Sequence, residues 1–407
     1  MIANNIEKSY RHLEESVGFY CGSLFYHPFR PPEHVYFSLT TRCNLRCLMC
    51  EVSKNPSVVE NELATEKIKE IILQIKQMKI AHLIFSGGEP LLRQDFLEII
   101  EYASAAIERV DVITNGLLFS DLLIQRLVEL QLNHITFSLD GLERTNDKIR
   151  GRGVFASVKE NIDRFKYYKS KHQARFPTLG INFTITSLNV DEMLPMIEFA
   201  RTSGLNAILF QPVLFNNVKM NEKDKNDLWL SGQEIDKLKT VVHEIVKIKA
   251  GLDDFVICCD NELLQAFPGY FSGTVSMVPF RCYEAIKRIV ITTSGKVWSC
   301  IGEYGDLLND SLQTIWLSEN ALRVRHSVAR CKANCVQECV YLPLQIKDLI
   351  RDFFAPLTEE KKDDYRKRLV RTLNEYQAVA QERKTPVKNS VNNIEMLAEI
   401  ARYAQTR

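Results

Sequence analysis

Three cysteines stand close together directly after an apolar stretch of the chain. Cys43, Cys47 and Cys50 have the spacing Cys-x3-Cys-x2-Cys and follow the apolar residues 35–39. Three thiolates on one short loop can hold three corners of a cubane iron–sulfur cluster, whereas ferredoxin-type loops normally supply a full set of Cys ligands. Because the nearby chain offers only three, one iron would keep an open position for a substrate or cofactor.

Zinc is the main alternative for these thiols. Structural Zn²⁺ prefers four ligands in tetrahedral geometry, and the nearest histidines, His34 and His82, lie far along the chain. A disulfide would leave one of the three thiols unpaired, and the cysteine usage indicates a reducing compartment. The spacing alone leaves zinc open, and the motifs that follow favour the cluster.

Further motifs extend the pattern. Residues 86–90 read Ser-Gly-Gly-Glu-Pro, 114–116 read Thr-Asn-Gly and 138–141 read Ser-Leu-Asp-Gly. Together with the cysteine triplet behind a first strand, they resemble the radical S-adenosylmethionine (radical SAM) superfamily from about residue 35 to 212. The resemblance implies a [4Fe–4S] cluster on Cys43, Cys47 and Cys50 that binds S-adenosylmethionine through its open iron. One electron then splits the cofactor, and the 5′-deoxyadenosyl radical takes a substrate hydrogen atom.

The Gly-Gly-Glu-Pro run is the first candidate for binding that cofactor. Gly87 and Gly88 lack side chains, so a backbone could approach the methionyl part of the cofactor closely. Glu89 could accept hydrogen bonds from the positively charged amino group, and Pro90 would fix the turn. An ordinary strand-to-helix loop would also use these residue types.

Other strand-end residues are weaker candidates for the same pocket. Ser138 could bond the ribose hydroxyls, whereas Asp140 favours a role in the following turn. Asn115 could line the pocket. Arg150 could pair with the cofactor carboxylate or hold its own loop, and Gln211 could touch adenine or ribose, or cap its strand. We assign no catalytic base.

A second cysteine group lies later in the chain. Its members are Cys282, Cys300, Cys331, Cys335 and Cys339. The hairpin pattern around Gly295 resembles the start of the SPASM and twitch extensions, which hold auxiliary [4Fe–4S] clusters. Five cysteines favour one such cluster, with Cys339 able to replace Cys331 or Cys335 as a ligand. Four of these thiols would also make a good zinc site. Sulfatase-maturating relatives carry an Asp base where this chain has Ile301, which argues against that activity.

Six short apolar runs alternate with amphipathic helical patterns. The runs are residues 35–40, 82–86, 110–114, 134–139, 180–186 and 207–213. Six βα units in series predict a parallel sheet with right-handed crossovers, and the resemblance implies a partial (β/α)6 TIM-type barrel with chemistry at the carboxyl ends of its strands. The fold class is therefore α/β, with a SPASM/twitch-like hairpin-plus-helix extension and a helical tail.

These patterns divide the chain into five segments. They are a helical lead and linker (1–34), the barrel core (35–215), barrel completion with a connecting helix (216–280), the auxiliary-cluster region (281–342) and a helical tail (343–407). Peptide-modifying relatives often carry an N-terminal peptide-binding domain, and only 34 residues precede the first strand here. This favours a small, sugar-like or alcohol-like substrate over a peptide.

The overall composition limits the kinds of partner that we expect for the chain. With 52 Lys plus Arg against 51 Asp plus Glu, the chain has no field that would draw it to nucleic acid or membrane. No apolar run is long enough to span a bilayer, and we expect a cytoplasmic enzyme served by a reductant such as flavodoxin or ferredoxin. Peptide maturation, a non-catalytic iron–sulfur or zinc scaffold, and RNA modification are the alternative functions.

Overall fold

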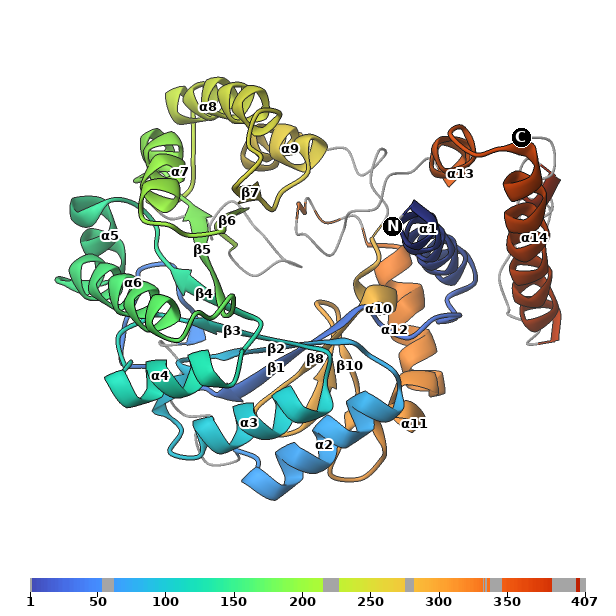
Figure 1. The fold of residues 1–407 in the computed structure, drawn as a ribbon, viewed down its shortest axis with the longest axis horizontal. Coiled ribbons are helices and arrows are strands. Elements are labelled where there is room, and N and C mark those ends of the chain that lie inside the picture. Colours follow the sequence, from blue (N-terminus) through green and yellow to red (C-terminus); the bar gives the residue numbers. More distant parts are fainter. Residues whose placement is uncertain are drawn as a thin grey trace.

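The computed structural model describes residues 2–52, 62–214, 227–274, 282–331, 333, 335–336, 346–382 and 400–402. One ten-stranded sheet runs through the molecule in the order β10-β9-β8-β1-β2-β3-β4-β5-β6-β7. All neighbouring pairs from β8 to β7 are parallel, and only β8-β9 and β9-β10 are antiparallel. Figure 1 shows this sheet curving with helices on its outer side, so the predicted partial barrel is confirmed.

The six predicted strands all form, and short strands extend the sheet on both sides. The barrel strands are β1 (His34–Thr40), β2 (His82–Gly87), β3 (Arg109–Thr114), β4 (His134–Ser138), β5 (Thr178–Ile185), β6 (Ala207–Pro212) and β7 (Val256–Ile257). The other strands are β8 (Arg288–Ile291), β9 (Lys296–Trp298) and β10 (Glu303–Asp306). Because every parallel strand points the same way, the loops that carry the sequence motifs meet at one edge of the sheet.

Amphipathic helices cover the outer face. Those between the strands are α2 (Thr65–Gln77), α3 (Phe96–Ala106), α4 (Asp121–Glu129), α5 (Glu143–Arg150), α6 (Val154–Lys171), α7 (Met193–Thr202), α8 (Gln233–Lys249) and α9 (Asn261–Ser272), with 3-10 turns η3 (Pro90–Leu92) and η4 (Val190–Glu192). In α2 the predicted apolar stripe of Ile68, Ile71, Ile72 and Ile75 is fully buried against the sheet. Burial of such stripes holds the barrel together.

The cysteine-bearing C-terminal region joins the barrel sheet directly. The predicted hairpin forms as β8 and β9, and β8 pairs in parallel with β1, aligning His34 with Arg288 and Phe37 with Ile291. Helices α10 (Glu284–Lys287), α11 (Leu312–Leu317) and α12 (Glu319–Ala329) flank it. The hairpin therefore continues the barrel wall, which local sequence patterns do not reveal.

The two ends of the chain form a separate helical module. Helices α1 (Ile2–Phe25), α13 (Ile346–Phe354) and α14 (Glu359–Glu382) lie side by side at the right of Figure 1. They share their own apolar core, in which Val17 and Leu369 are completely buried. Glu7 of α1 also accepts hydrogen bonds from Arg368 of α14. None of the described helices is both long and apolar enough to cross a bilayer.

Candidate cofactor and metal sites

The Cys loop, residues 41–50, leaves the carboxyl end of β1. Cys47 is buried, whereas Cys43 and Cys50 are partly exposed, and none of the three forms a disulfide. Burial is the main cause that raises the pKa of Cys47 to about 11, and repulsion from the Cys50 and Cys43 thiolates acts in the same direction. The three thiols are thus close neighbours, and a cationic iron cluster would offset the cost of ionising them.

The donor set of the Cys loop bears on the choice between a cluster and a single ion. Across the described ranges, no three His, Cys, Asp or Glu side chains converge where one metal ion could bind. A single Zn²⁺ ion is coordinated by all four of its ligands, whereas in a cubane cluster each thiolate coordinates a different iron. The donor set of Cys43, Cys47 and Cys50 fits a three-cornered cluster.

The Gly-Gly pair packs against the entry to this loop. Gly88 N–H donates to the Thr40 carbonyl at 2.7 Å, and Glu89 N–H donates to the Arg42 carbonyl at 2.7 Å. A Cβ atom on Gly87 would lie 2.3 Å from the Thr40 oxygen, and one on Gly88 would lie 2.1 Å from the Arg42 oxygen. The glycines thus allow a close backbone contact that positions the Cys loop. This role is in addition to the close approach of the cofactor that the sequence predicts for them.

This contact predicts a measurable cost for a methyl group. Gly88→Ala is expected to destabilise the protein by about 1–3 kcal/mol, because backbone atoms rather than a flexible side chain must move. Gly251→Ala is the control, since its Cβ would only meet the Ile248 carbonyl at an ordinary 3.8 Å. Urea unfolding of the apoprotein compares the two variants. Equal stabilities would show that the loop after β2 adapts freely.

Glu89 is completely buried and ties the loop after β2 to the end of β3. Its Oε1 accepts from Thr114 Oγ1 at 2.8 Å and Leu91 N–H at 3.2 Å, and its Oε2 accepts from Asn115 N–H at 2.7 Å. Burial raises the pKa of Glu89, and these hydrogen bonds oppose that rise. A carboxylate has about four acceptor positions, and these hydrogen bonds fill three of them. Pro90 begins the turn η3 beside it.

Asn115 lies directly against the Cys loop. Its Nδ2 is 3.9 Å from Cys43 Sγ and donates to Asn44 Oδ1 at 2.7 Å. Its own Oδ1 accepts from Leu117 N–H. The residue therefore holds the first cysteine in place, as groups that hydrogen-bond to metal ligands do.

Arg150 and Asp140 form a buried pair beside the second cysteine. Arg150 Nε lies 2.6 Å from Asp140 Oδ2, and Arg150 Nη1 lies 3.9 Å from Cys47 Sγ. Asp140 Oδ1 also accepts from Thr184 N–H at 2.7 Å. The sequence favoured a turn for Asp140, but its side chain joins β4, β5 and Arg150. Of the two roles open to Arg150, this pairing supports holding the loop.

Ser138 and Gln211 occupy the strand ends where the sequence placed them. Ser138 is the last residue of β4 and pairs with Asn182 in the ladder to β5. Gln211 lies near the end of β6 and lines a cavity inside the barrel. Their contacts with ribose or adenine stay predictions.

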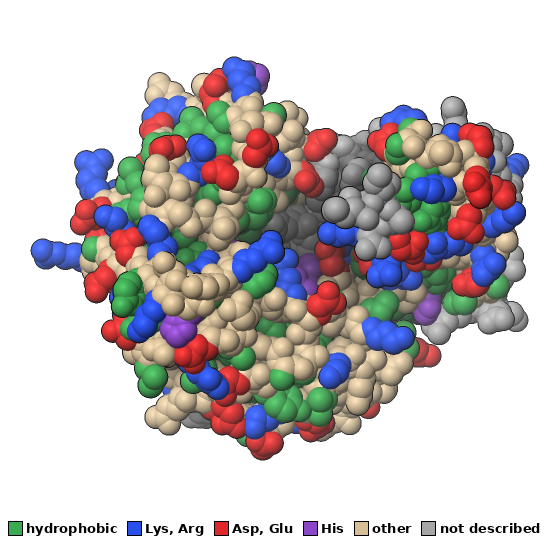
Figure 2. Space-filling view, in the orientation of Figure 1, with side chains coloured by type: hydrophobic (Ala, Val, Ile, Leu, Met, Phe, Trp, Pro, Cys, Tyr) green, Lys and Arg blue, Asp and Glu red, His purple; other side chains and the backbone are tan. Residues whose placement is uncertain are grey.

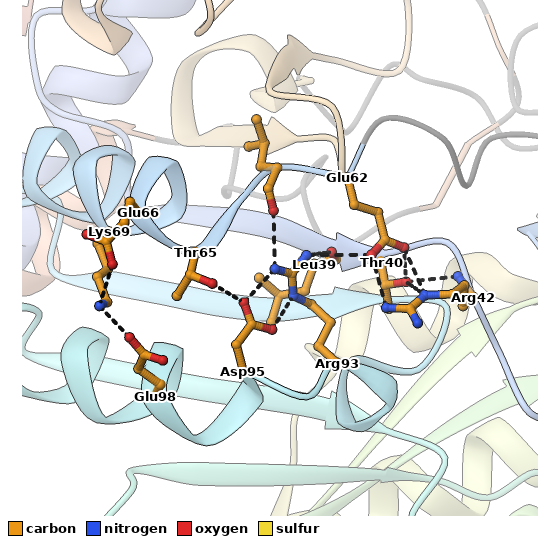
Figure 3. Close-up of polar contacts among 11 residues, drawn as sticks. Leu39, Thr40, Arg42, Glu62, Thr65, Glu66, Lys69, Arg93, Asp95 and Glu98 are labelled. Atoms are coloured by element: carbon orange, nitrogen blue, oxygen red, sulfur yellow. Dashed lines mark hydrogen bonds and ion pairs between the residues drawn. The ribbon is translucent and has the colours of Figure 1, made fainter.

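A polar network that the sequence did not indicate fixes the base of the Cys loop (Figure 3). Arg93 is 8% exposed and donates to the Leu39 and Leu63 carbonyls, each at 3.2 Å. Its Nε and Nη2 also bond the Asp95 carboxylate, at 2.9 and 2.7 Å. This one guanidinium joins the end of β1 to the segment before α2 and to the turn η3.

Glu62 extends the network toward the cysteines. Its carboxylate accepts from the Thr40 hydroxyl and from Arg42 Nη2, the latter at 3.1 Å (Figure 3). Arg42 immediately precedes Cys43. The loop that carries the thiols is therefore held by side chains at its first residues before any cluster binds.

Cysteines of the second group influence one another's pKa. Burial raises the pKa of Cys300 to about 12, and Glu284, Cys335 and Cys331 act in the same direction. Burial likewise raises the pKa of Cys282, with Cys300 and Cys335 among the contributors. These contributions indicate that Cys282, Cys300, Cys331 and Cys335 lie in one region, and their role as ligands stays a prediction. The predicted alternative ligand, Cys339, lies outside the described residues.

A cavity of about 410 Å³ lies inside the barrel. Polar side chains from strands β2 to β6 line it, namely His82, Arg109, Asp111, His134, Asn182 and Gln211. His82 Nε2 lies 2.8 Å from Asp111 Oδ2, and Arg109 donates to the same carboxylate. Val336, which follows Cys335 in the chain, also lines the cavity. The sequence indicated Gln211 but not His82, Arg109, Asp111 and His134, which lie at or near the amino ends of different strands.

Comparison with known proteins agrees with this arrangement. The family profile described as "Radical SAM superfamily" matches residues 37–200. That segment is a radical SAM domain. It contains the Cys loop and the Gly-Gly-Glu-Pro run, and proteins of this superfamily bind a [4Fe–4S] cluster and S-adenosylmethionine. The radical SAM resemblance predicted from the sequence is thus confirmed for this segment, and the predicted cofactors are those that the superfamily binds, whereas the individual ligand residues stay predictions.

The proteins of similar sequence are named for different reactions. The chain is 31% identical to Fe-coproporphyrin III synthase of Methanosarcina barkeri over 44% of this chain and 44% of that protein. It is 30% identical to the mycofactocin maturase of Mycolicibacterium smegmatis over 41% of each. It is 27% identical to GTP 3′,8-cyclase of Lactiplantibacillus plantarum over 66% of this chain and 79% of that protein. The chain thus spans less than half of the first two relatives.

Solved structures share the fold. The enzyme anSMEcpe with bound AdoMet superposes with a TM-score of 0.58 at 16% identity, over 80% of this chain and 97% of that one. SuiB of Streptococcus suis bound to S-adenosylmethionine superposes with a TM-score of 0.56 at 13% identity, over 72% and 68%. At such low identity the likeness concerns the fold alone.

Proposed function

We propose that this chain is a radical SAM enzyme whose cluster is held by Cys43, Cys47 and Cys50. The observation that carries the proposal is the presence of three thiols on one loop, with Asn115 and Arg150 approaching two of their sulfurs. When bound, the cluster and S-adenosylmethionine supply a 5′-deoxyadenosyl radical that abstracts a hydrogen atom from the substrate.

The residues of the chain position and shield this chemistry. The Gly-Gly contact and the Arg93 network hold the Cys loop at the carboxyl edge of the sheet. Arg150 places positive charge beside Cys47, which favours the thiolate form needed for iron binding. The free acceptor position on Glu89 suits the amino group of the cofactor. The barrel walls exclude water from a radical.

The second cysteine group is proposed to hold one auxiliary [4Fe–4S] cluster. Its preferred ligands are Cys282, Cys300, Cys331 and Cys335, whose mutual influence on each other's pKa supports a shared site. An auxiliary cluster there would border the barrel cavity through Val336. It could accept an electron from the substrate or anchor it.

We propose a small polar substrate, such as a sugar or alcohol. The cavity volume of about 410 Å³ suits a small molecule. Asn182 Oδ1 is buried without a hydrogen-bond partner among the described residues and lines this cavity, so a substrate hydroxyl could donate to it. A peptide substrate is the second candidate, because SuiB and anSMEcpe also have structures with bound peptides. The cytoplasmic location stays a prediction.

Cleavage of S-adenosylmethionine tests the proposed activity. The anaerobically reconstituted wild type, reduced with dithionite, is expected to form 5′-deoxyadenosine and methionine without any added substrate. Chromatography with mass detection measures both products, and omission of dithionite is the control. A protein that holds iron and sulfide yet forms no 5′-deoxyadenosine would support the scaffold alternative instead.

A further inference from the structure

A row of basic residues crosses the barrel sheet at its amino end. Strand pairing aligns Arg288 of β8 with His34 of β1. It also aligns His34 with His82 of β2, and His82 with Arg109 of β3. These four strands are neighbours in the sheet, so each contributes an Arg or a His at the same level. We call Arg288, His34, His82 and Arg109 the basic row, and all of them except His34 line the cavity inside the barrel.

A carboxylate beside this row already has basic partners. Asp111 is the one acidic residue among the described residues that line the cavity. Its Oδ2 lies 2.8 Å from His82 Nε2 and accepts from Arg109 Nε and Nη2 at 3.0 and 2.7 Å. Burial acts to raise the pKa of Asp111, but its bonds to His82 and Arg109 outweigh burial and hold the pKa below its usual range. Asp111 is therefore ionised, and it orients two members of the basic row.

Arg109 keeps hydrogen-bond donors for a ligand. A guanidinium has five N–H donors, and Asp111 binds those of Nε and Nη2. No other residue that the structure describes accepts a hydrogen bond from the Arg109 side chain, which is 53% exposed. Arg288 pairs with Glu284 of α10 at 2.6 Å, and Glu284 does not line the cavity. The row thus presents guanidinium groups to the cavity, and their planar geometry suits the oxygens of a phosphate or a carboxylate.

The surroundings of the row are positive. Burial is the main cause that lowers the pKa of His34 to about 3. The charged neighbours that act in the same direction are all basic, namely Arg288, His82, Lys287 and Arg109. His34 is therefore neutral, and its position favours a negative charge over a further positive one. In the view of Figure 2, Lys, Arg and His side chains gather, with a few carboxylates among them, around the hollow in the middle of the molecule.

We infer that the basic row binds an acidic group of the substrate, a phosphate or a carboxylate, at the amino end of the cavity. The inference rests on the proposed function and narrows its small polar substrate to an acidic one, such as a sugar phosphate or a sugar acid. The Cys loop lies at the opposite, carboxyl end of the strands. Asn182, which pairs with the last residue of β4, lines the cavity toward that end. An acidic group held at the row therefore leaves the rest of the substrate facing the Cys loop.

Calorimetric titration of the reconstituted protein tests this inference. The probes are glucose 6-phosphate, gluconate and uncharged glucose. The wild type is expected to bind at least one of the two acidic probes about tenfold more tightly than glucose. Arg109→Gln removes a positive charge from the row, so it should weaken binding of that acidic probe about tenfold and leave glucose binding unchanged. Arg126→Gln on α4, whose side chain pairs with Glu101 outside the cavity, is the matched control and should bind as the wild type does.

A second variant separates recognition of an anion from a structural role. Asp111→Asn removes the negative charge beside the row, so the acidic probes should bind at least as tightly as they do to the wild type. A purely structural Arg109–Asp111 pair would instead give weaker binding in both variants, and that result would overturn an acidic substrate. Wild-type binding by Arg109→Gln, equal binding of all three probes, or no binding of either acidic probe would also overturn it. The titration does not require cleavage, so failure of the wild type to form 5′-deoxyadenosine with dithionite would refute the proposed function separately.

Discussion

The Cys43→Ala/Cys47→Ala/Cys50→Ala protein is expected to form no detectable 5′-deoxyadenosine under conditions in which the wild type does. The three thiols are the only ligands that the loop offers, and their removal leaves no iron with an open position beside the cofactor pocket. The variant should keep about four of the about eight irons of the wild type, since the second cysteine group is untouched. Iron analysis and product chromatography measure the two effects.

A matched control tests whether replacing any cysteine lowers iron content or cleavage. Cys21→Ala changes a thiol of α1 that lies outside both cysteine groups and does not line the barrel cavity, and it should leave iron content and cleavage unchanged. If the triple variant still formed 5′-deoxyadenosine at the rate of the wild type, the cofactor-binding cluster would have to lie elsewhere.

Single changes in the second cysteine group should separate two activities. Cys282→Ala and Cys300→Ala are expected to lose about half of the iron, because neither cysteine has a neighbour in sequence that could replace it. Both should still cleave S-adenosylmethionine but should not turn over the true substrate. Among Cys331, Cys335 and Cys339, the residue that does not bind iron should tolerate Ala.

Metal analysis decides whether this second group holds iron at all. Zinc without iron in the triple Cys43/Cys47/Cys50 variant would refute an auxiliary cluster. Full substrate turnover by Cys300→Ala would show that the region is structural. Both measurements are made on the complete chain, so neither depends on folding of an isolated segment.

The sequence predicted those parts of the fold that local patterns encode. The six strand ranges and the stripe of α2 follow from apolar periodicity, and the structure confirms them. The close approach at Gly88 also agrees with its residue type, since any side chain would meet the Arg42 carbonyl. Such features depend mainly on residues that are close together in the chain, and these can be read from a single sequence.

Features that depend on distant partners were not predictable in this way. Nothing in the sequence near β8 indicates that it pairs with β1. The paired residues His34 and Arg288 are roughly 250 positions apart in the chain. The pairing of Asp140 with Arg150 and the Arg93 network join residues whose types also suit turns and surfaces. Terminal helices α1 and α14 likewise share a core that neither amphipathic pattern assigns to the other.

These long-range contacts determine how the candidate site is held. The Arg93 network and the Gly-Gly contact fix the start of the Cys loop, and Asn115 and Arg150 reach its sulfurs from β3 and α5. Contacts of this kind preorganise a loop for the group it is proposed to bind. The cysteine spacing indicates the chemistry, whereas the contacts between distant segments determine how the cysteines are positioned.

Electron paramagnetic resonance of the reduced Cys282→Ala protein tests the central claim most directly. This variant should contain only the cluster on Cys43, Cys47 and Cys50, so its spectrum reports on that site alone. Addition of S-adenosylmethionine is expected to shift the g values, because the cofactor would bind the open iron and change its coordination. A spectrum that stays the same at saturating S-adenosylmethionine would contradict a cofactor-binding cluster at these three cysteines.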